Sequence, residues 1–383
     1  MSDLVSLGSP KDPVISDDPR INLMGLSCEA LEAFAIEELG DKPFRGRQLF
    51  KWIYAKKVSS FDVMTDVSKV ARKKLEEIAR IGRMDERTVQ KSSDGTMKFL
   101  WGLEDGLQVE SVLIPEESRQ TLCISTQVGC PIDCDFCVTA KGGFARNLTK
   151  GEILGQIVQA AMHCPDKPIT NIVLMGMGEP LLNLDNVIDT METAQDTAGL
   201  GLSHRKITLS TVGLIPQLEE FGRRSRINLA VSLHGTTEEQ RTAIMPINRK
   251  YPLDELIAAL KRFPLPNRKC VTIEYILLSG VNDSIDDAHR LARLLRGIRS
   301  KVNLIPYNIN PFTDYKRPED RDIVAFQEVL MDYGLHTVAR LNRGGDIDAA
   351  CGQLGGYKQQ RPKRKKPTPA PSDDSVTNER EQA

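Results

Sequence analysis

Residues 121–137 read TLCISTQVGCPIDCDFC, a strand-like run that leads directly into three closely spaced cysteines. Cys130, Cys134 and Cys137 form a C-x3-C-x2-C pattern, whereas the other cysteines are scattered along the chain. Thiolates bind both iron–sulfur clusters and zinc. Structural zinc sites usually need four ligands in two spaced pairs, and the sequence offers no second pair. The pattern therefore favours a [4Fe–4S] cluster with one iron left open.

Strand-like runs recur after residue 121 and alternate with helical or loop stretches. They are TLCISTQ, ITNIVLMG, KITLST, INLAVSLH, VTIEYILL and KVNLIPY. Such alternation predicts a parallel sheet with right-handed crossovers, and six units are too few for a closed eight-stranded barrel. We therefore predict an α/β fold, a partial (βα)6 barrel with its chemistry at the carboxyl ends of the strands. Thr149 and Glu152 form a capping box that starts an early helix.

The remaining segments differ in character. Residues 1–22 predict a flexible leader, and residues 23–85 predict a helical domain in which Lys and Arg recur around aromatic residues. A solvated helical bundle is the simpler interpretation of that domain, and an RNA-docking module is the sharper alternative. Two Asp-Gly turns predict a short β meander over 86–120, before a barrel domain over 121–356. The basic and then Pro/Ser/acidic composition of residues 357–383 predicts a disordered tail.

The bulk composition is that of an ordinary globular protein, with 40% hydrophobic and 27% charged residues. No apolar run approaches the ~20 residues of a membrane helix, and the first residues lack the layout of a secretory signal. We therefore expect a cytoplasmic protein with no membrane contact. A formal net charge of −1 does not by itself indicate a nucleic-acid binder.

A second motif, IVLMGMGEP, places Gly178 and Glu179 directly after the second predicted strand. Glycines there let a ligand approach the backbone closely, and a carboxylate can accept hydrogen bonds from an ammonium group. Other small or polar residues end later strands: Ser210, Ser232, Leu233, His234 and Asn308. Each alone is more simply a structural cap, but their shared position favours a common ligand site.

Two further cysteines stand apart from the cluster motif. Cys123 lies within the first strand, and Cys351 lies in RGGDIDAACGQLGG. Free cysteines are often simply small buried apolar residues. The Gly-flanked segment around Cys351 is not a typical core stretch, however, and we expect it to fold back over the barrel mouth.

Taken together, QVGC-x3-C-x2-C, GF-x-RNLT, GMGEP and DIDAACGQL make residues 26–355 resemble the RlmN family. The resemblance implies a radical S-adenosylmethionine (SAM) enzyme that methylates carbon-2 of an adenosine in 23S rRNA, and in some bacteria in tRNA. It implies two SAM molecules per turnover, an electron donor such as flavodoxin or ferredoxin, and we expect a monomer.

The resemblance also implies a role for each residue of the motifs. The cysteine triad would ligate the cluster, Cys351 would accept a methyl group, Cys123 would resolve an RNA–protein adduct, and Glu110 would accept a proton. The SAM contacts would be Gly178, Glu179, Ser210, Ser232, Leu233, His234 and Asn308, with Asn310 as an alternative to Asn308.

Two other functions stay open at this point. The related Cfr type of enzyme methylates carbon-8 of adenosine and shares much of this framework. A protein of a different class, a non-catalytic RNA-binding protein stapled by a metal, would also need clustered cysteines.

Overall fold

The computed structural model describes residues 18–340 and 342–355. Most of the predicted leader and the whole predicted tail over 357–383 lie outside the described residues. In the described ranges, no helix is both long and apolar enough to cross a membrane.

One mixed sheet dominates the described residues, with strand order β14-β13-β12-β11-β10-β9-β6-β5-β4-β3. Its parallel part comprises β6 (Gln120–Cys123), β9 (Asn171–Leu174), β10 (Ile207–Thr211), β11 (Asn228–Ser232), β12 (Val271–Leu277), β13 (Ser300–Pro306) and β14 (Thr337–Ala339). The first six of these confirm the predicted strands of the partial barrel. The sequence analysis did not predict β14, which has only three residues.

The meander continues this sheet. Its strands are β3 (Asp85–Lys91), β4 (Met97–Gly102) and β5 (Gln108–Pro115). β5 pairs antiparallel with β6, which is the first barrel strand. The segment that looked like a connection between two domains therefore contributes one wall of the barrel.

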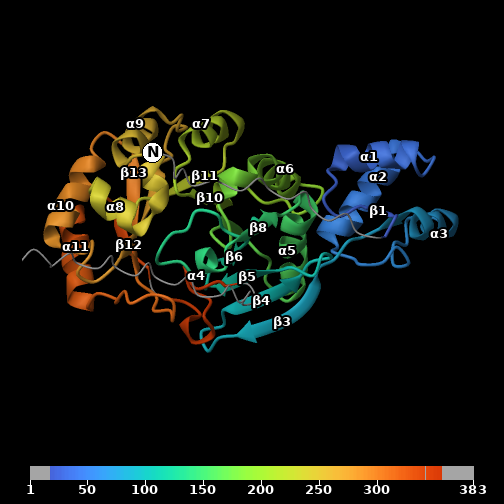
Figure 1. The fold of residues 1–383 in the computed structure, drawn as a ribbon. Helices are drawn as coiled ribbons and strands as arrows, with labels where there is room; N and C mark the ends of the chain where they lie inside the picture. Colours follow the sequence, from blue (N-terminus) through green and yellow to red (C-terminus); the bar gives the residue numbers. More distant parts are fainter. Residues whose placement is uncertain (1–17, 341, 356–383) are drawn as a thin grey trace, which may run out of the picture.

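Helices cover the outer face of the parallel strands (Figure 1). They are α5 (Lys150–Met162), α6 (Leu184–Gln195), α7 (Ile215–Arg224), α8 (Glu238–Ile244), α9 (Leu253–Arg262), α10 (Ile285–Leu294) and α11 (Asp320–Asp332). Short 3-10 turns η2 (Pro180–Asn183), η3 (His204–Lys206) and η4 (Pro246–Arg249) lie in the connections, and a fourth, η5 (Gly345–Ile347), lies in the C-terminal segment. The predicted capping box starts α5, because the Thr149 side chain accepts from the Glu152 amide and the Glu152 carboxylate accepts from the Thr149 amide.

The N-terminal helices lie at one end of the molecule, beside α5 and α6 (Figure 1). They are α1 (Cys28–Glu37), α2 (Pro43–Phe50), the π-helical turn η1 (Lys51–Ala55) and α3 (Lys69–Ile78), with a small sheet of β1 (Ile21–Asn22) and β2 (Ala79–Arg80). Glycines allow close packing on the barrel: a Cβ at Gly25 would lie 2.8 Å from the Gly151 nitrogen.

A separate hairpin frames the cysteine motif. β7 (Gln127–Gly129) pairs antiparallel with β8 (Phe144–Asn147), and the short helix α4 (Val138–Lys141) lies between them. The single strand predicted over TLCISTQ is therefore wrong in its extent. The chain leaves the sheet after Cys123, and Gln127 pairs with Asn147 instead.

Candidate active site

The inner face of the parallel sheet carries polar residues from several strands. Directly paired residues of neighbouring strands point to the same side of a sheet, and the register aligns Ser232 with Glu274 and Glu274 with Asn303. Ser210 pairs with Ala230, two residues before Ser232, and so shares this face. Ser210, Ser232 and Asn303 are partly accessible. The barrel therefore encloses a polar interior that ligands can enter.

The cysteine motif forms a loop fixed by backbone hydrogen bonds. The Cys130 amide donates to the Gly143 carbonyl at 2.9 Å, and the Cys137 amide donates to the Cys134 carbonyl at 3.2 Å. Burial raises the pKa of the Cys130 and Cys134 thiols, and the neighbouring thiols of the motif raise it further. Three thiols thus lie near one another, with Cys134 buried and Cys130 and Cys137 partly accessible.

This donor set fits an iron–sulfur cluster better than a single ion. In the part of the chain that the structure describes, no three Cys, His, Asp or Glu side chains are grouped closely enough to hold one metal ion. A [4Fe–4S] cube takes one thiolate for each iron, so three neighbouring thiols suit a cube with one iron left open. The buried Arg241 adds a positive charge that lowers the pKa of Cys134.

The GMGEP loop is tightly packed after β9. Gly178 has a φ of 103°, and a Cβ there would lie 2.5 Å from the Gln127 side chain, so this position requires glycine. The carboxylate of Glu179 accepts from the Leu181 amide at 3.0 Å and the Val212 amide at 2.9 Å. Burial raises its pKa to about 7. A carboxylate has about four acceptor positions, so it retains capacity for an ammonium group.

The SLH segment after β11 divides into accessible and buried residues. Ser232 is partly accessible, whereas Leu233 is fully buried. His234 has a φ of 59°, and its Nδ1 accepts from the Ile276 amide at 3.1 Å. Burial lowers the pKa of His234 to about 3, which keeps the ring neutral. His234 is a predicted SAM contact, but its Nδ1 atom already accepts a hydrogen bond from β12.

Asn308 and Asn310 serve different neighbours. The Asn308 side chain donates to the Cys351 carbonyl at 3.0 Å. The Asn310 side chain donates to the Phe136 carbonyl at 3.1 Å and to the Tyr307 hydroxyl at 2.9 Å. The loop after β13 therefore holds both the cysteine motif and the C-terminal segment.

The structure places Cys351 close enough to Cys123 for the two side chains to interact electrostatically. Cys123 ends β6, and its buried thiol has its pKa raised to about 12 by burial and by the nearby Cys351. Burial also raises the pKa of Cys351, while a hydrogen bond and the charge of Arg340 lower it. Both cysteines are free thiols.

The C-terminal segment 342–355 is anchored on two sides. On one side, the Val138 amide donates to the Gly352 carbonyl at 2.8 Å, which ties the segment to the cysteine motif. On the other side, the Gly344 amide donates to the Asp94 carboxylate at 3.0 Å in the β3–β4 turn. The segment thus folds back over the barrel mouth.

Glu110 lies on β5 beside this segment. One of its oxygens accepts from the Gly355 amide at 2.9 Å, and the other lies 3.8 Å from the Lys98 ammonium. Val112, two residues further along β5, pairs directly with Cys123. Glu110 therefore shares a face of the sheet with the Cys123 thiol.

Comparisons with known proteins agree with this arrangement. A model described as "Ribosomal RNA large subunit methyltransferase N-terminal domain" matches residues 21–81, and the "Radical SAM superfamily" model matches residues 124–292. The "Dual-specificity RNA methyltransferase RlmN" of Geobacter sulfurreducens is 50% identical over 339 residues, which is 88% of this chain and 93% of the relative. The chain belongs to the RlmN family.

Other RlmN proteins and one solved structure support the same assignment. The protein of that name from Syntrophotalea carbinolica is 48% identical over 346 residues, covering 90% of this chain and 92% of the relative. The crystal structure of a radical SAM methyltransferase from Sphaerobacter thermophilus matches with a TM-score of 0.84 and 39% identity, covering 87% and 99% of the two chains. The chain is thus a radical SAM enzyme of an RNA methyltransferase family, which uses a [4Fe–4S] cluster and SAM and acts on RNA. The alternative of a non-catalytic protein stapled by a metal is thereby excluded.

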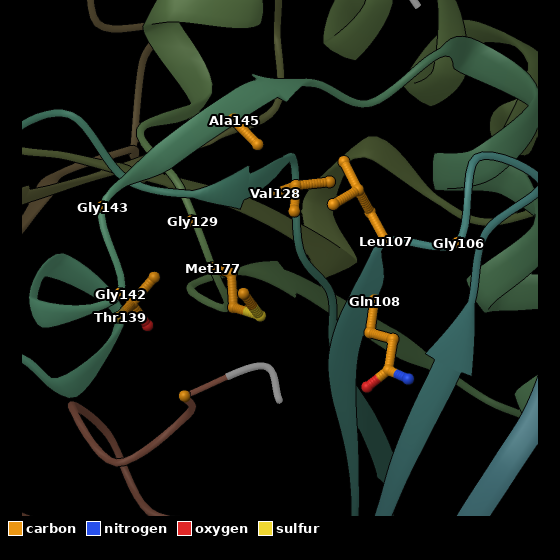
Figure 2. A pocket seen from close by; sticks show the side chains of 11 residues that line it. Gly106, Leu107, Gln108, Val128, Gly129, Thr139, Gly142, Gly143, Ala145 and Met177 are labelled. Carbon is orange, nitrogen blue, oxygen red and sulfur yellow. The ribbon is translucent and has the colours of Figure 1, made fainter. Parts of the chain in front are cut away.

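A pocket of about 140 Å³ lies between the start of β5, the β7–β8 hairpin and Gly355 (Figure 2). Its lining comprises Gly106, Leu107, Gln108, Val128, Gly129, Thr139, Gly142, Gly143, Ala145, Met177 and Gly355. Gly355 is also the residue that donates to Glu110. A Cβ at Gly129 would lie 1.8 Å from the Gly143 carbonyl oxygen, so glycine is needed for the close approach of β7 and β8.

Several residues of this RlmN site escaped the sequence analysis. Lys98 and Asp94 lie in the meander, and Arg340 follows the unpredicted β14. Arg241 is buried beneath the SLH segment, where it donates to the Leu233 carbonyl. Asp94 belongs to one of the Asp-Gly turns, but the turn motif predicts only the hairpin and not a contact with the C-terminal segment. Lys98, Arg241 and Arg340 belong to no local motif, so no sequence pattern indicated their role.

Proposed function

We propose that this protein methylates carbon-2 of an adenosine in 23S rRNA and in tRNA. The juxtaposition of Cys351 and Cys123 at the barrel mouth is the observation that carries the proposal. Most radical SAM reactions need no second thiol, whereas a methyl group carried on one cysteine needs another to release the product. The dual specificity named for the relatives supports both RNA classes as substrates.

The proposed chemistry assigns one task to each residue. The bound cluster and SAM supply an electrophilic methyl group and a means of homolytic hydrogen abstraction. The Cys351 thiolate accepts the methyl group, and the activated methylene carbon bonds to carbon-2 of adenine. Glu110 would remove the proton from carbon-2 of adenine, and the adduct radical would give up one electron, which would return to the bound cluster. The Cys123 thiolate would then attack the Cys351 sulfur and break the bond between that sulfur and the methylene carbon. The released carbon would take up a proton to become the methyl group, and a disulfide would be left for an external reductant.

The neighbours of Glu110 support its role as the proton acceptor. The Lys98 ammonium lies 3.8 Å from one carboxylate oxygen, and the Gly355 amide donates to the other at 2.9 Å. These two contacts hold the carboxylate in a fixed position. Five of the eleven residues that line the neighbouring pocket are glycines, which leaves space for a flat base.

The proposed ligand sets follow the same geometry. Cys130, Cys134 and Cys137 would hold the cluster. The residues toward SAM would be Gly178, Glu179, Ser210, Ser232, Leu233, His234 and Asn308. We assign Glu179 to the ammonium group because it is the buried carboxylate nearest the cysteine motif, and it acts on the Cys130 thiol electrostatically. Asn308, which faces Cys351, is preferred to Asn310, which is committed to holding Phe136.

We further propose that residues 23–85 dock RNA, before the meander over 86–120 and the barrel domain over 121–356. Exposed lysines on this domain, including Lys51, Lys56 and Lys73, support that role, because phosphate contacts supply most of the affinity for RNA. A cytoplasmic monomer that receives electrons from a flavodoxin or ferredoxin completes the proposal.

The decisive experiment is mass spectrometry of nucleosides from 23S rRNA and tRNA of cells with and without this protein. We expect 2-methyladenosine in both RNAs, dependent on the protein and abolished by Cys351→Ala. Methylation at carbon-8 would instead assign the Cfr-type activity and overturn the proposal. The absence of any protein-dependent adenosine methylation would also overturn it.

A further inference from the structure

Arg340 reaches the inner face of the sheet from its outermost parallel strand. Its amide donates to the Leu304 carbonyl at 2.8 Å, which continues the pairing of β14 with β13. Val338 pairs with Asn303, and side chains alternate along a strand, so Arg340 lies on the same face as Asn303. This is the face that carries Glu274 and the strand-end serines.

Glu274 is the nearest carboxylate to Arg340. The Glu274 side chain is only 4% exposed, and its Oε1 lies 3.9 Å from an Arg340 nitrogen and accepts from Asn303 at 3.0 Å. Its buried Oε2 has no hydrogen-bond partner among the described residues. Burying a carboxylate is costly unless a cation or donors compensate it, so Arg340 and Glu274 hold each other in place.

The same guanidinium contacts the cysteine pair. It hydrogen-bonds the Cys351 side chain and acts electrostatically on Cys123. A guanidinium presents five donors in a rigid fork, so one Arg can serve a carboxylate and a thiolate together. A buried thiolate ready to attack SAM needs such a counter-charge.

We propose that Arg340 is a positioning residue that, braced by Glu274, holds the Cys351 sulfur for methyl transfer. This inference rests on the proposed role of Cys351 as the methyl acceptor. In this proposal Arg340 acts through the cysteine and not on SAM or RNA directly. The groups that face the pair come from several elements: Glu274 on β12, Lys301 on β13, Cys123 on β6 and Cys137 in the cysteine motif.

A merely structural role would have a different signature. If Arg340 only closed the sheet edge, removal of either Arg340 or Glu274 would loosen the same region. Both variants would then change Cys351 reactivity in the same direction. If Arg340 stabilises the thiolate and Glu274 opposes it, the two variants move the pH profile of Cys351 in opposite directions.

The test measures alkylation of Cys351 by iodoacetamide across pH in the full chain with its cluster and without SAM. Peptide mass spectrometry follows Cys351, and Cys270, which lies just before β12 at the opposite end of the strands, is the internal reference. The variants are Arg340→Met, Arg340→Lys and Glu274→Gln. Stoichiometry of Cys351 S-methylation after addition of SAM is measured on the same samples.

We expect Arg340→Met to move the Cys351 profile to higher pH and to slow alkylation at pH 8 about threefold. The alkylation rate falls less than the thiolate population does, because a more basic thiolate is a better nucleophile. Glu274→Gln moves the profile to lower pH, Arg340→Lys restores part of the loss, and Cys270 is unaffected.

Shifts in the same direction for Arg340→Met and Glu274→Gln, or no shift, would overturn the inference. If Arg340→Met does not fold, the Arg340→Lys and Glu274→Gln profiles decide it by the same criterion. Failure of the proposed function can be told apart from failure of this inference. If Cys351 of the native protein stays unmodified after SAM is added, its role as methyl acceptor is refuted, whatever the alkylation profiles show.

Discussion

Replacement of Asp94 by Ala should loosen the C-terminal segment at the point where it meets the β3–β4 turn. Asp94 sits in an Asp-Gly turn, where its carboxylate accepts from the Thr96 amide at 2.9 Å and from the Gly344 amide at 3.0 Å. The first bond shapes the turn, and the second fixes the start of the segment that carries Cys351. Although burial opposes the shift, these amides hold the pKa of Asp94 down at about 2.

The size of the effect follows from these two hydrogen bonds. A hydrogen bond to a charged group contributes about 1.5–3 kcal/mol, and the Asp94 side chain is 27% exposed, so water replaces part of each bond. We therefore expect the local opening free energy of the segment to fall by about 2 kcal/mol, which is roughly a 30-fold larger opening equilibrium constant. Since the pKa of Asp94 is lowered on folding, this contribution is present above pH 4 and is lost as the pH falls toward 2.

Amide hydrogen exchange of peptides covering residues 342–355 measures this opening directly. The control is Asp85→Ala, which removes an exposed partner of Arg87 at the start of the same hairpin and should leave exchange in the segment unchanged. Slower methylation of Cys351 by SAM should accompany the faster exchange. Unchanged exchange at Gly344 in Asp94→Ala would refute the idea that this carboxylate anchors the segment.

Three other predictions test the site and its support. The Cys123→Ala variant should leave RNA covalently linked to Cys351, which would appear as a shifted band on a denaturing gel. The Cys351→Ala variant should abolish methylation of RNA and still cleave SAM. Free RNA with normal turnover in Cys123→Ala would contradict the resolving role of Cys123. Arg146→Met should lower the free energy of unfolding by about 3–5 kcal/mol in denaturant titrations, because this buried side chain bridges two carboxylates at 2.6 and 2.8 Å; the exposed Arg223→Met is the control, with an effect near zero. The affinity for SAM, measured by titration calorimetry, should weaken about tenfold for each pH unit below 7. The reason is that the pKa of Glu179 is about 7 and a protonated carboxyl cannot pair with an ammonium group. A pH-independent affinity in the native protein would argue against that pairing.

The barrel strands were predictable because their signal is local. Parallel strands under a helical cover read as short apolar runs, and this is visible at Ile207 and Leu209, which are buried on the outer face of β10. The capping box at Thr149 and the cysteine spacing are likewise contained within a few residues. The sequence therefore predicted the six strands, the motif loops and the residues at the strand ends.

The parts that escaped prediction depend on partners far away in the sequence. β14 is three residues long, too short for a periodic pattern, and it is defined by its pairing with β13. Lys98 meets Glu110 and the Asp348 carbonyl only because the meander and the C-terminal segment pack together. The sequence also could not predict that the Ile276 amide donates to His234 Nδ1. A Ser-Leu-His segment at the end of a strand is compatible with either a ligand contact or a structural hydrogen bond.

The position of Cys351 in the chain has a consequence for how the enzyme is made. Synthesis and folding proceed from the N-terminus, so β6, the cysteine motif and β9–β13 are all complete before residue 351 leaves the ribosome. On the proposed roles, a chain interrupted between β13 and Cys351 would have the radical-generating half of the site without the thiol that carries the methyl group. Residues 342–355 are thus the last described part of the site to be synthesised, and on the proposed roles they bring the methyl carrier.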